Sequence, residues 1–179
     1  IYISEYWRAP GGQRRHYDII DPDTGVYSRA YLEMRLRQEV SRARRNGGHL
    51  SVSLIRVKDR AALNSNSGAG REAMPSVAAL FSALLRDEDL MARFDDTTFA
   101  LMLPDLSGQE AKSAVEELRL RLGSATVSLD QFLGTSTFRG IASVAELNDG
   151  DANEEELLKG ALAALRDAER GTYGRVILR

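Results

Sequence analysis

Hydrophobic residues in the first half of the chain recur with periods that predict a helix, a strand and a second helix. Apolar positions follow a helical spacing over residues 28–45, with Ser28 as N-cap, and Asn46-Gly47-Gly48 ends the pattern. Residues 50–57 alternate and are rich in β-branched side chains, which is typical of a strand. A polar segment over residues 64–70 predicts a loop, and apolar residues on one face of residues 77–84 predict the next helix.

The second half of the chain predicts a hairpin followed by alternating helices and strands. Two short apolar segments, residues 90–94 and 99–103, flank a polar turn and predict the hairpin. Helices are expected at residues 108–122 and 153–170, a strand near residues 136–144, and a closing strand within residues 175–178. This order favours an α/β sheet with antiparallel pairs over a purely parallel, doubly wound sheet.

Length and composition predict one globular domain behind an N-terminal linker. The 179 residues, 43% of them hydrophobic, are enough for one substantial core. Residues 1–19 lack a clear period and contain Pro10-Gly11-Gly12, which predicts a linker, with the domain over residues 20–179. Because the chain starts at Ile1 rather than Met, we expect a preceding sensory or membrane domain in the same protein. The domain itself is expected in the cytoplasm, as the cytoplasmic part of a membrane-anchored protein if that upstream region spans a membrane.

Charge and reactive residues exclude several classes of function. The net charge of −2 and the pI of about 5.8 give no overall attraction to nucleic acid. With no Cys, the chain has no disulfide framework, thiolate nucleophile or sulfur-ligated metal, and two His residues are too few for a histidine metal site. The positive charge is mostly Arg, a side chain suited to forked recognition of phosphate and carboxylate.

Residues 85–104 carry the most specific motif of the chain. Arg86-x-x-Asp89 is followed after five residues by Asp95-Asp96-Thr97-Thr98-Phe99 and by an apolar strand that ends at Pro104. The segment resembles the signature of GGDEF domains, the diguanylate cyclase family, in which Arg-x-x-Asp precedes Gly-Gly-(Asp/Glu)-Glu-Phe. Residues 21–29, 136–142 and 157–175 resemble further motifs of that family in the same order. The resemblance implies a palm-like domain related to nucleotidyl cyclases, with a mainly antiparallel sheet of about five strands wrapped by helices.

The same resemblance implies that the metal site is degenerate. Active members join two GTP molecules into cyclic di-GMP with divalent metals held by carboxylates. Here Arg56 aligns with the first acidic ligand and Thr97 with the second, while Asp95 and Asp96 replace the two glycines and Thr98 replaces the signature Glu. Carboxylates facing a triphosphate disfavour its binding. We therefore expect no metal, no cofactor and no catalytic residues, and we read the four residues as a solvated turn.

Nucleotide contacts are expected to be lost as well. Asn64 aligns with a guanine-recognising Asn, but the acidic partner of that Asn appears as Arg71. Ala61 and Glu169 stand where the family has lysines that touch phosphate. The expected degenerate site therefore comprises the positions Arg56, Asn64, Arg71, Asp95, Asp96, Thr97 and Thr98.

Arg86 and Asp89 match the family's inhibitory site, where cyclic di-GMP binds. A guanidinium can fork onto phosphate or the Hoogsteen edge of guanine, and a carboxylate can accept from guanine N1–H and N2–H. The spacing alone is unspecific, since Arg15-x-x-Asp18 and Arg93-x-x-Asp96 also have it, and the competing interpretation is an exposed salt bridge. The Arg that often completes such a site aligns with Glu117, so Arg119 is the nearby candidate.

Two functions follow from these expectations. The first is a receptor without catalytic activity that binds cyclic di-GMP through Arg86 and Asp89. The alternative is a dimerisation or docking scaffold, acting as a homodimer without bound nucleotide. Residual cyclase activity is not expected.

Overall fold

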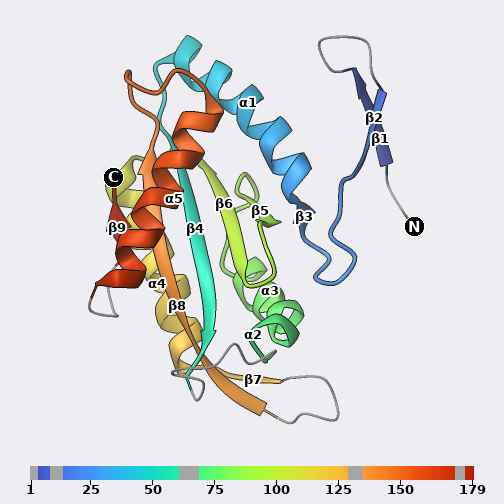
Figure 1. Cartoon of the computed structure of the whole chain (residues 1–179). Coiled ribbons are helices and arrows are strands. Elements are labelled where there is room, and N and C mark those ends of the chain that lie inside the picture. The colour runs from blue at the N-terminus through green and yellow to red at the C-terminus, as the bar shows by residue number, and fades with distance from the viewer. Residues whose placement is uncertain (1–3, 9–13, 61–68, 129–134, 172–175) are drawn as a thin grey trace.

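The central feature of the fold is a seven-stranded sheet (Figure 1). The computed structural model describes residues 4–8, 14–60, 69–128, 135–171 and 176–179. The strands of this sheet are β3 (Tyr27–Ser28), β4 (Leu50–Asp59), β5 (Leu90–Arg93), β6 (Thr98–Pro104), β7 (Thr126–Ser128), β8 (Thr135–Glu146) and β9 (Ile177–Leu178). Their order is β3-β5-β6-β4-β8-β7, and β9 pairs with β8. The pairs β3–β5 and β8–β9 are parallel and the others antiparallel. The predicted class is confirmed, with more strands than the five or so expected.

Five helices surround the sheet in the described residues. They are α1 (Arg29–Asn46), α2 (Ala69–Glu72), α3 (Met74–Ser82), α4 (Gly108–Ser124) and α5 (Glu154–Arg170). Helix α1 begins and ends as predicted, because the Ser28 hydroxyl accepts from the Tyr31 amide and Gly47 takes the left-handed φ of 64° at the C-cap. Helix α2 begins at Ala69, inside the segment predicted as a loop.

The sheet separates two hydrophobic cores because β4 is buried on both faces. Leu50, Val52 and Leu54 pack with residues of α1 and α5, whereas Ile55 and Val57 pack with residues of α3 and α4. Alternate residues of a strand point to opposite faces, so the β4 sequence supplies both cores. Figure 1 shows α1 and α5 on one side of the sheet and α3 and α4 on the other.

Two short strands and an N-terminal hairpin were absent from the predicted elements. Strands β3 and β7 span two and three residues, which is too short for a hydrophobic period to be visible. Strand β9 lies within the closing strand predicted at residues 175–178 and pairs with β8. The segment predicted as a linker contains β1 (Ser4–Arg8) and β2 (Arg14–Asp18), which pair antiparallel. Among the described helices, none has the length and hydrophobicity needed to cross a membrane.

Because β4 is central, we expect its buried side chains to contribute strongly to the stability of the fold. The Leu54 side chain is fully buried, whereas Leu120 on α4 is 57% exposed. We expect Leu54→Ala to lower the free energy of unfolding by about 2–5 kcal/mol, because it leaves a cavity between β4 and the α1 and α5 layer. The matched control Leu120→Ala should change it by less than about 0.5 kcal/mol. Urea unfolding followed by circular dichroism measures both, and equal effects would contradict the assigned burial.

Candidate functional site

The turn between β5 and β6 is stabilised by its own residues. The backbone amides of Phe94 and Asp95 donate to the carbonyl of Thr98, over 2.9 and 3.3 Å. The Thr97 amide donates to Asp95 Oδ1 over 2.9 Å. Among the described non-glycine residues, Asp105 alone has a positive φ, so this turn accommodates Asp95 and Asp96 without backbone strain. Aspartates at the aligned glycine positions therefore do not disturb the hairpin.

Strand β4 carries Arg56 and Lys58 to the α5 face of the sheet. They continue the row of Leu50, Val52 and Leu54, so the row changes from apolar to cationic near the end of the strand. Arg139 of β8 lies directly opposite Lys58. Like charges in cross-strand positions repel, so this end of the sheet requires acidic partners.

Glu169 of α5 and Asp95 of the turn are those partners. Arg56 Nη1 donates to Glu169 Oε1 over 2.8 Å, and Lys58 Nζ lies 3.1 Å from the same oxygen. Arg56 Nε donates to the buried Thr98 hydroxyl over 3.1 Å, and Nη2 lies 3.4 Å from Asp95 Oδ2. The guanidinium of Arg56 is thus surrounded by groups of the protein itself.

The pKa of Glu169 reports the balance at this cluster. Partial burial raises the pKa of Glu169. Hydrogen bonds from Arg56 and Lys58, together with their positive charges, lower it by a larger amount, so the pKa lies below its ordinary value. The carboxylate is therefore ionised and held by two cations at neutral pH. Arg56 and Glu169 together form an ion pair where the resemblance would place a metal ligand and a phosphate-binding Lys.

Arg93 organises the same turn and was not among the predicted site residues. Its guanidinium is largely buried and donates to the backbone carbonyls of Asp95 and Asp96 over 3.1 and 3.0 Å. It also lies 3.5 Å from Asp21 and 3.6 Å from Asp23. The Arg93-x-x-Asp96 spacing is visible in the sequence, but the contact to Asp96 is through a carbonyl, which the spacing does not reveal.

The remaining positions of the predicted degenerate site lie apart from this cluster or outside the described residues. Arg71 is exposed at the end of α2. Asn64 and Ala61 fall outside the described residues. In the part of the chain that the structure describes, no three His, Asp or Glu side chains gather closely enough to hold a metal ion.

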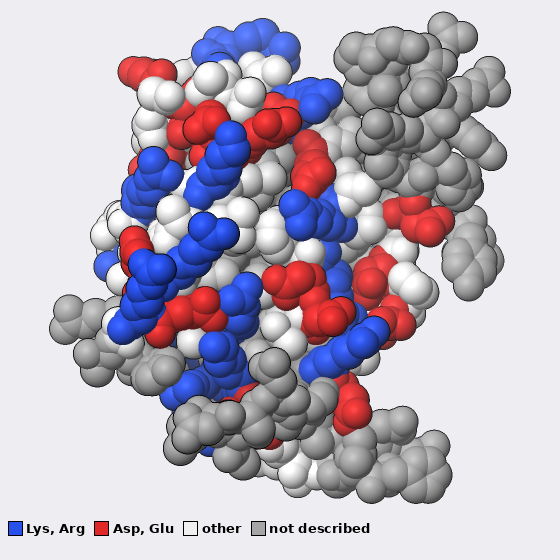
Figure 2. Space-filling model, viewed as in Figure 1, with Lys and Arg blue, Asp and Glu red and all other residues white. Residues whose placement is uncertain are grey.

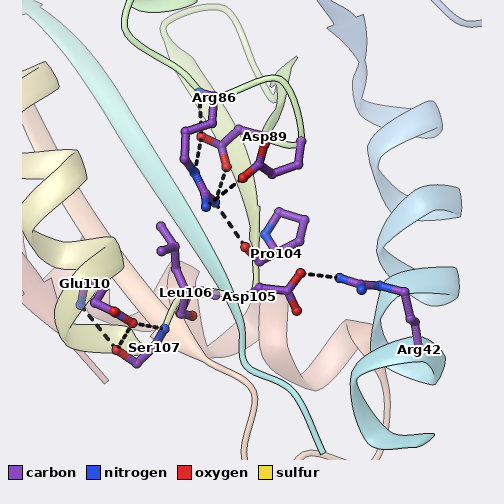
Figure 3. Close-up of polar contacts among 10 residues, drawn as sticks. Arg42, Arg86, Asp89, Pro104, Asp105, Leu106, Ser107 and Glu110 are labelled. Carbon is purple, nitrogen blue, oxygen red and sulfur yellow. Dashed lines mark hydrogen bonds and ion pairs between the residues drawn. The ribbon is translucent and has the colours of Figure 1, made fainter. Parts of the chain in front are cut away.

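Arg86 and Asp89 form a close pair between α3 and β5 (Figure 3). Asp89 accepts from the Arg86 backbone amide over 2.9 Å, from Nη2 over 2.7 Å and from Nε over 3.3 Å. Arg86 Nη2 also donates to the carbonyl of Pro104 over 3.0 Å, and Nη1 lies 2.9 Å from Glu88. The Asp89 side chain is 4% exposed, against 38% for Arg86. The guanidinium of the pair is therefore accessible to solvent, whereas the carboxylate is buried.

The pair lies between two pockets. One, of about 210 Å³, lies between the end of α3 and α4, and Glu117 contributes to its wall. The other, of about 330 Å³, is bordered by Tyr27 of β3. Both pockets include Arg86 and Asp89 in their walls.

Arg119 does not join this pair within the chain. Its Nε donates to Glu116 over 2.9 Å, and its side chain lies against Gly140 of β8, where an added Cβ would approach the Arg119 Cγ to 3.2 Å. Residues 117 and 119 project in nearly opposite directions on a helix. Glu117, rather than Arg119, therefore faces the pocket beside Arg86.

Charges of both signs are interspersed on the face shown in Figure 2. Among the described residues, ion pairs such as Arg37–Glu154 and Lys159–Glu156 join charges of opposite sign. Binding to a nucleic acid backbone favours a continuous basic surface. This face does not present one.

Comparisons with known proteins agree on one family. Residues 18–174 match the family described as "Diguanylate cyclase, GGDEF domain". The chain is 31% identical over 158 residues to the probable diguanylate cyclase DgcC of Escherichia coli, covering 87% of this chain and 42% of that protein. It is 32% identical over 113 residues to the diguanylate cyclase DgcP of Pseudomonas aeruginosa, covering 62% of this chain and 17% of that protein. The chain thus spans less than half the length of these curated relatives.

A solved structure supports the same fold. The GGDEF domain of DgcB from Caulobacter crescentus, in complex with cyclic di-GMP, superposes with a TM-score of 0.78 over 92% of this chain and 97% of that one. The sequence identity is 18%, so this likeness concerns the fold alone.

We expect the stability that Glu169 contributes through Arg56 to depend on pH. Because the folded-state pKa of Glu169 is lowered below the ordinary value of 4.5, its stabilising contribution is present above that value and is lost as the pH falls through the folded-state pKa. Glu169→Gln should lower the melting temperature by about 2–4 °C near neutral pH, equivalent to about 1 kcal/mol, and the difference should vanish once the pH lies below the folded-state pKa of Glu169.

Thermal unfolding at several pH values measures this effect. Asp167→Asn on the same helix is the matched control, because Asp167 is 69% exposed and lies 4.0 Å from Arg170. An effect of Glu169→Gln that is independent of pH, or equal to that of the control, would contradict the ionic role of Glu169.

Proposed function

Because the chain belongs to the diguanylate cyclase GGDEF domain family, we propose that it is a catalytically inactive member that binds cyclic di-GMP through Arg86 and Asp89 and acts as a receptor module. The observation that carries this proposal is the partly exposed Arg86 guanidinium, held by a buried carboxylate between two pockets. An oriented guanidinium beside a hollow suits recognition of a phosphate oxygen or of a guanine acceptor through the two N–H groups of Nη1, which Asp89 and Pro104 leave unused.

Strong contacts hold the Arg86 guanidinium in one orientation, and a weak ion pair covers its remaining nitrogen. Its bonds to Asp89 and to the Pro104 carbonyl hold Nε and Nη2 in place. Nη1 faces Glu88, which is 54% exposed. An exposed ion pair contributes only about 0–1 kcal/mol, so a ligand can replace Glu88 at Nη1 at little cost.

Loss of catalysis is supported by the arrangement around Arg56. Hard divalent metals require free carboxylate oxygens. The acids nearest the aligned metal position, Asp95 and Glu169, both pair with Arg56. A metal ion would have to displace a guanidinium of like charge, so the cluster supports a structural rather than a catalytic role.

The wider setting belongs to the same proposal. The module would receive cyclic di-GMP in the cytoplasm and pass the signal to an upstream sensory or membrane domain or to a second copy of the chain. A structural relative, the diguanylate cyclase SiaD of Pseudomonas aeruginosa, is in complex with its activator SiaC, which supports partner binding by a protein of this fold.

Calorimetric titration with cyclic di-GMP tests the ligand. We expect heat of binding for the unaltered chain and at least a tenfold loss of affinity, roughly, in Arg86→Ala, since hydrogen bonds to a charged group contribute about 1.5–3 kcal/mol. Arg170→Ala is the control, because Arg170 is 81% exposed on α5 and borders neither pocket.

Two outcomes would contradict binding at this pair. One is an absence of heat at high micromolar ligand, and the other is unchanged affinity in Arg86→Ala. A concentration-dependent dimer in ultracentrifugation, together with no nucleotide binding, would instead support the scaffold function.

Incubation with GTP and Mg²⁺ or Mn²⁺ tests the loss of catalysis. We expect no cyclic di-GMP in the chromatogram, because the acids near Arg56 are paired with it. Product that forms with the unaltered chain and disappears in Asp95→Ala or Asp96→Ala would refute the proposal.

A further inference from the structure

A third pocket lies between α1 and α5, the two helices on one side of the sheet (Figure 1). Its volume of about 310 Å³ is near the lower limit of the range of roughly 300–1,000 Å³ that holds small-molecule ligands. Phe94, Leu158 and Leu162 form its apolar floor. Phe94 and Leu158 are buried members of the core beneath α1 and α5. This α1–α5 pocket is therefore an opening above the hydrophobic core.

Charged side chains of both signs border the floor. The border is formed by Arg29, Glu33 and Arg37 of α1 and by Glu154, Glu155 and Lys159 of α5. Positive and negative charges are equal in number, so a ligand with a single charge would meet groups of its own sign. A zwitterion, in contrast, can place each of its charges beside the opposite charge.

Glu155 is the acid of this border that is available to a ligand. Glu154 is 11% exposed and accepts from Arg37 Nε over 2.7 Å. Glu33 accepts from Arg29 Nε over 2.8 Å. Glu155 is exposed in the first turn of α5, and in the described ranges its carboxylate makes no hydrogen bond or ion pair. It can therefore accept from an ammonium group.

Arg29 supplies an oriented cation to the same pocket. Its guanidinium lies 4.2 Å from the centre of the Phe94 ring, and its Nε donates to Glu33. The cation–π contact and the ion pair together hold the plane of the guanidinium. Its two Nη groups have no hydrogen-bond partner among the described residues. Because guanidinium donors match a carboxylate in a forked geometry, Arg29 can receive a carboxylate there.

These two available groups lie at opposite ends of the pocket. Because Glu154 pairs with Arg37, the first turn of α5 lies beside Arg37. Arg29 precedes Arg37 by eight residues of α1, which is about 12 Å along the helix axis. An extended peptide of two residues is roughly 7 Å long, and a hydrogen bond at each terminus adds about 3 Å. A dipeptide therefore spans the pocket, whereas a single amino acid is too short.

We propose that the α1–α5 pocket binds a dipeptide with free termini and an apolar side chain. Glu155 accepts from the terminal ammonium group, and the Nη groups of Arg29 bind the terminal carboxylate. Successive side chains of an extended peptide point to opposite faces, so one lies on the apolar floor and the other faces solvent. No residue of this pocket borders the two pockets at Arg86, so the inference is independent of cyclic di-GMP binding.

Titration of the full chain with leucyl-leucine, followed by NMR, tests this ligand. We expect saturable shift changes and intermolecular NOEs from the leucine methyl groups to the ring of Phe94. N-acetyl-leucyl-leucine and leucyl-leucine amide each lack one terminal charge, so each should bind about fivefold more weakly. Free leucine should also bind more weakly than the dipeptide, because it cannot reach both ends of the pocket.

Variants at the two ends of the pocket provide a second test. Arg29→Gln and Glu155→Gln should each weaken binding of leucyl-leucine about fivefold. Arg29→Gln should not weaken binding of leucyl-leucine amide, because that ligand has no carboxylate to lose. Arg170→Gln and Asp167→Asn are the matched controls, since both residues are exposed on α5 and neither borders the pocket. Both controls should bind leucyl-leucine as the unaltered chain does.

Several results would overturn the proposal. One is an absence of saturable binding of leucyl-leucine at millimolar concentration. Another is equal binding of N-acetyl-leucyl-leucine amide, which would indicate a segment of a protein partner instead. Unchanged affinity in Arg29→Gln or Glu155→Gln would refute the assigned ends.

The test is also protected against misfolded variants and against failure of the receptor function. Circular dichroism verifies the fold of each variant, and the ligand derivatives probe the same contacts without altering the chain. Arg86→Ala should bind leucyl-leucine with unchanged affinity, whatever its affinity for cyclic di-GMP. Loss of dipeptide binding in Arg86→Ala would contradict the assignment to the α1–α5 pocket.

Discussion

The register of β4 between β6 and β8 determines which side chains meet in this domain. Strand β4 is hydrogen-bonded to a strand on each side, β6 and β8. Its residues are also buried on both faces of the sheet. Leu54 faces α1 and α5, and the next residue, Ile55, faces α3 and α4. A shift by one residue would exchange these faces and bring Arg56 into the other core. The two hydrophobic cores and the charge cluster at Arg56 therefore depend on a single alignment.

The same alignment explains how the fold is compatible with the proposed loss of catalysis. The sheet is stabilised by apolar residues of β4, β6 and β8, whereas the aligned catalytic positions lie at strand ends and turns. There, Arg56, Glu169 and Asp95 neutralise one another. In the proposed inactive member, charges that pair internally stand where a metal and a triphosphate would be bound.

The ligand site proposed at Arg86 lies on the opposite side of the sheet from this cluster. It is built from the end of α3, the start of β5 and one face of α4, next to the core that contains Phe81 and Leu118. The proposed loss of catalysis therefore places no direct constraint on Arg86. A capped α4 holds the pocket wall in position, since Glu146 and Ser107 satisfy its first backbone amides.

The sequence by itself determined the long elements, the family and the pairing of Arg86 with Asp89. Helical and strand periods are local, so α1, β4, the hairpin and α5 follow from neighbouring residues. Strands β3 and β7, the role of Arg93 and the choice of Glu117 over Arg119 at the pocket wall were decided only by the tertiary structure. These features share one physical reason. Each depends on a partner distant in the chain or on the rotation of a helix against the sheet, and the spacing of adjacent residues encodes neither the partner nor the rotation.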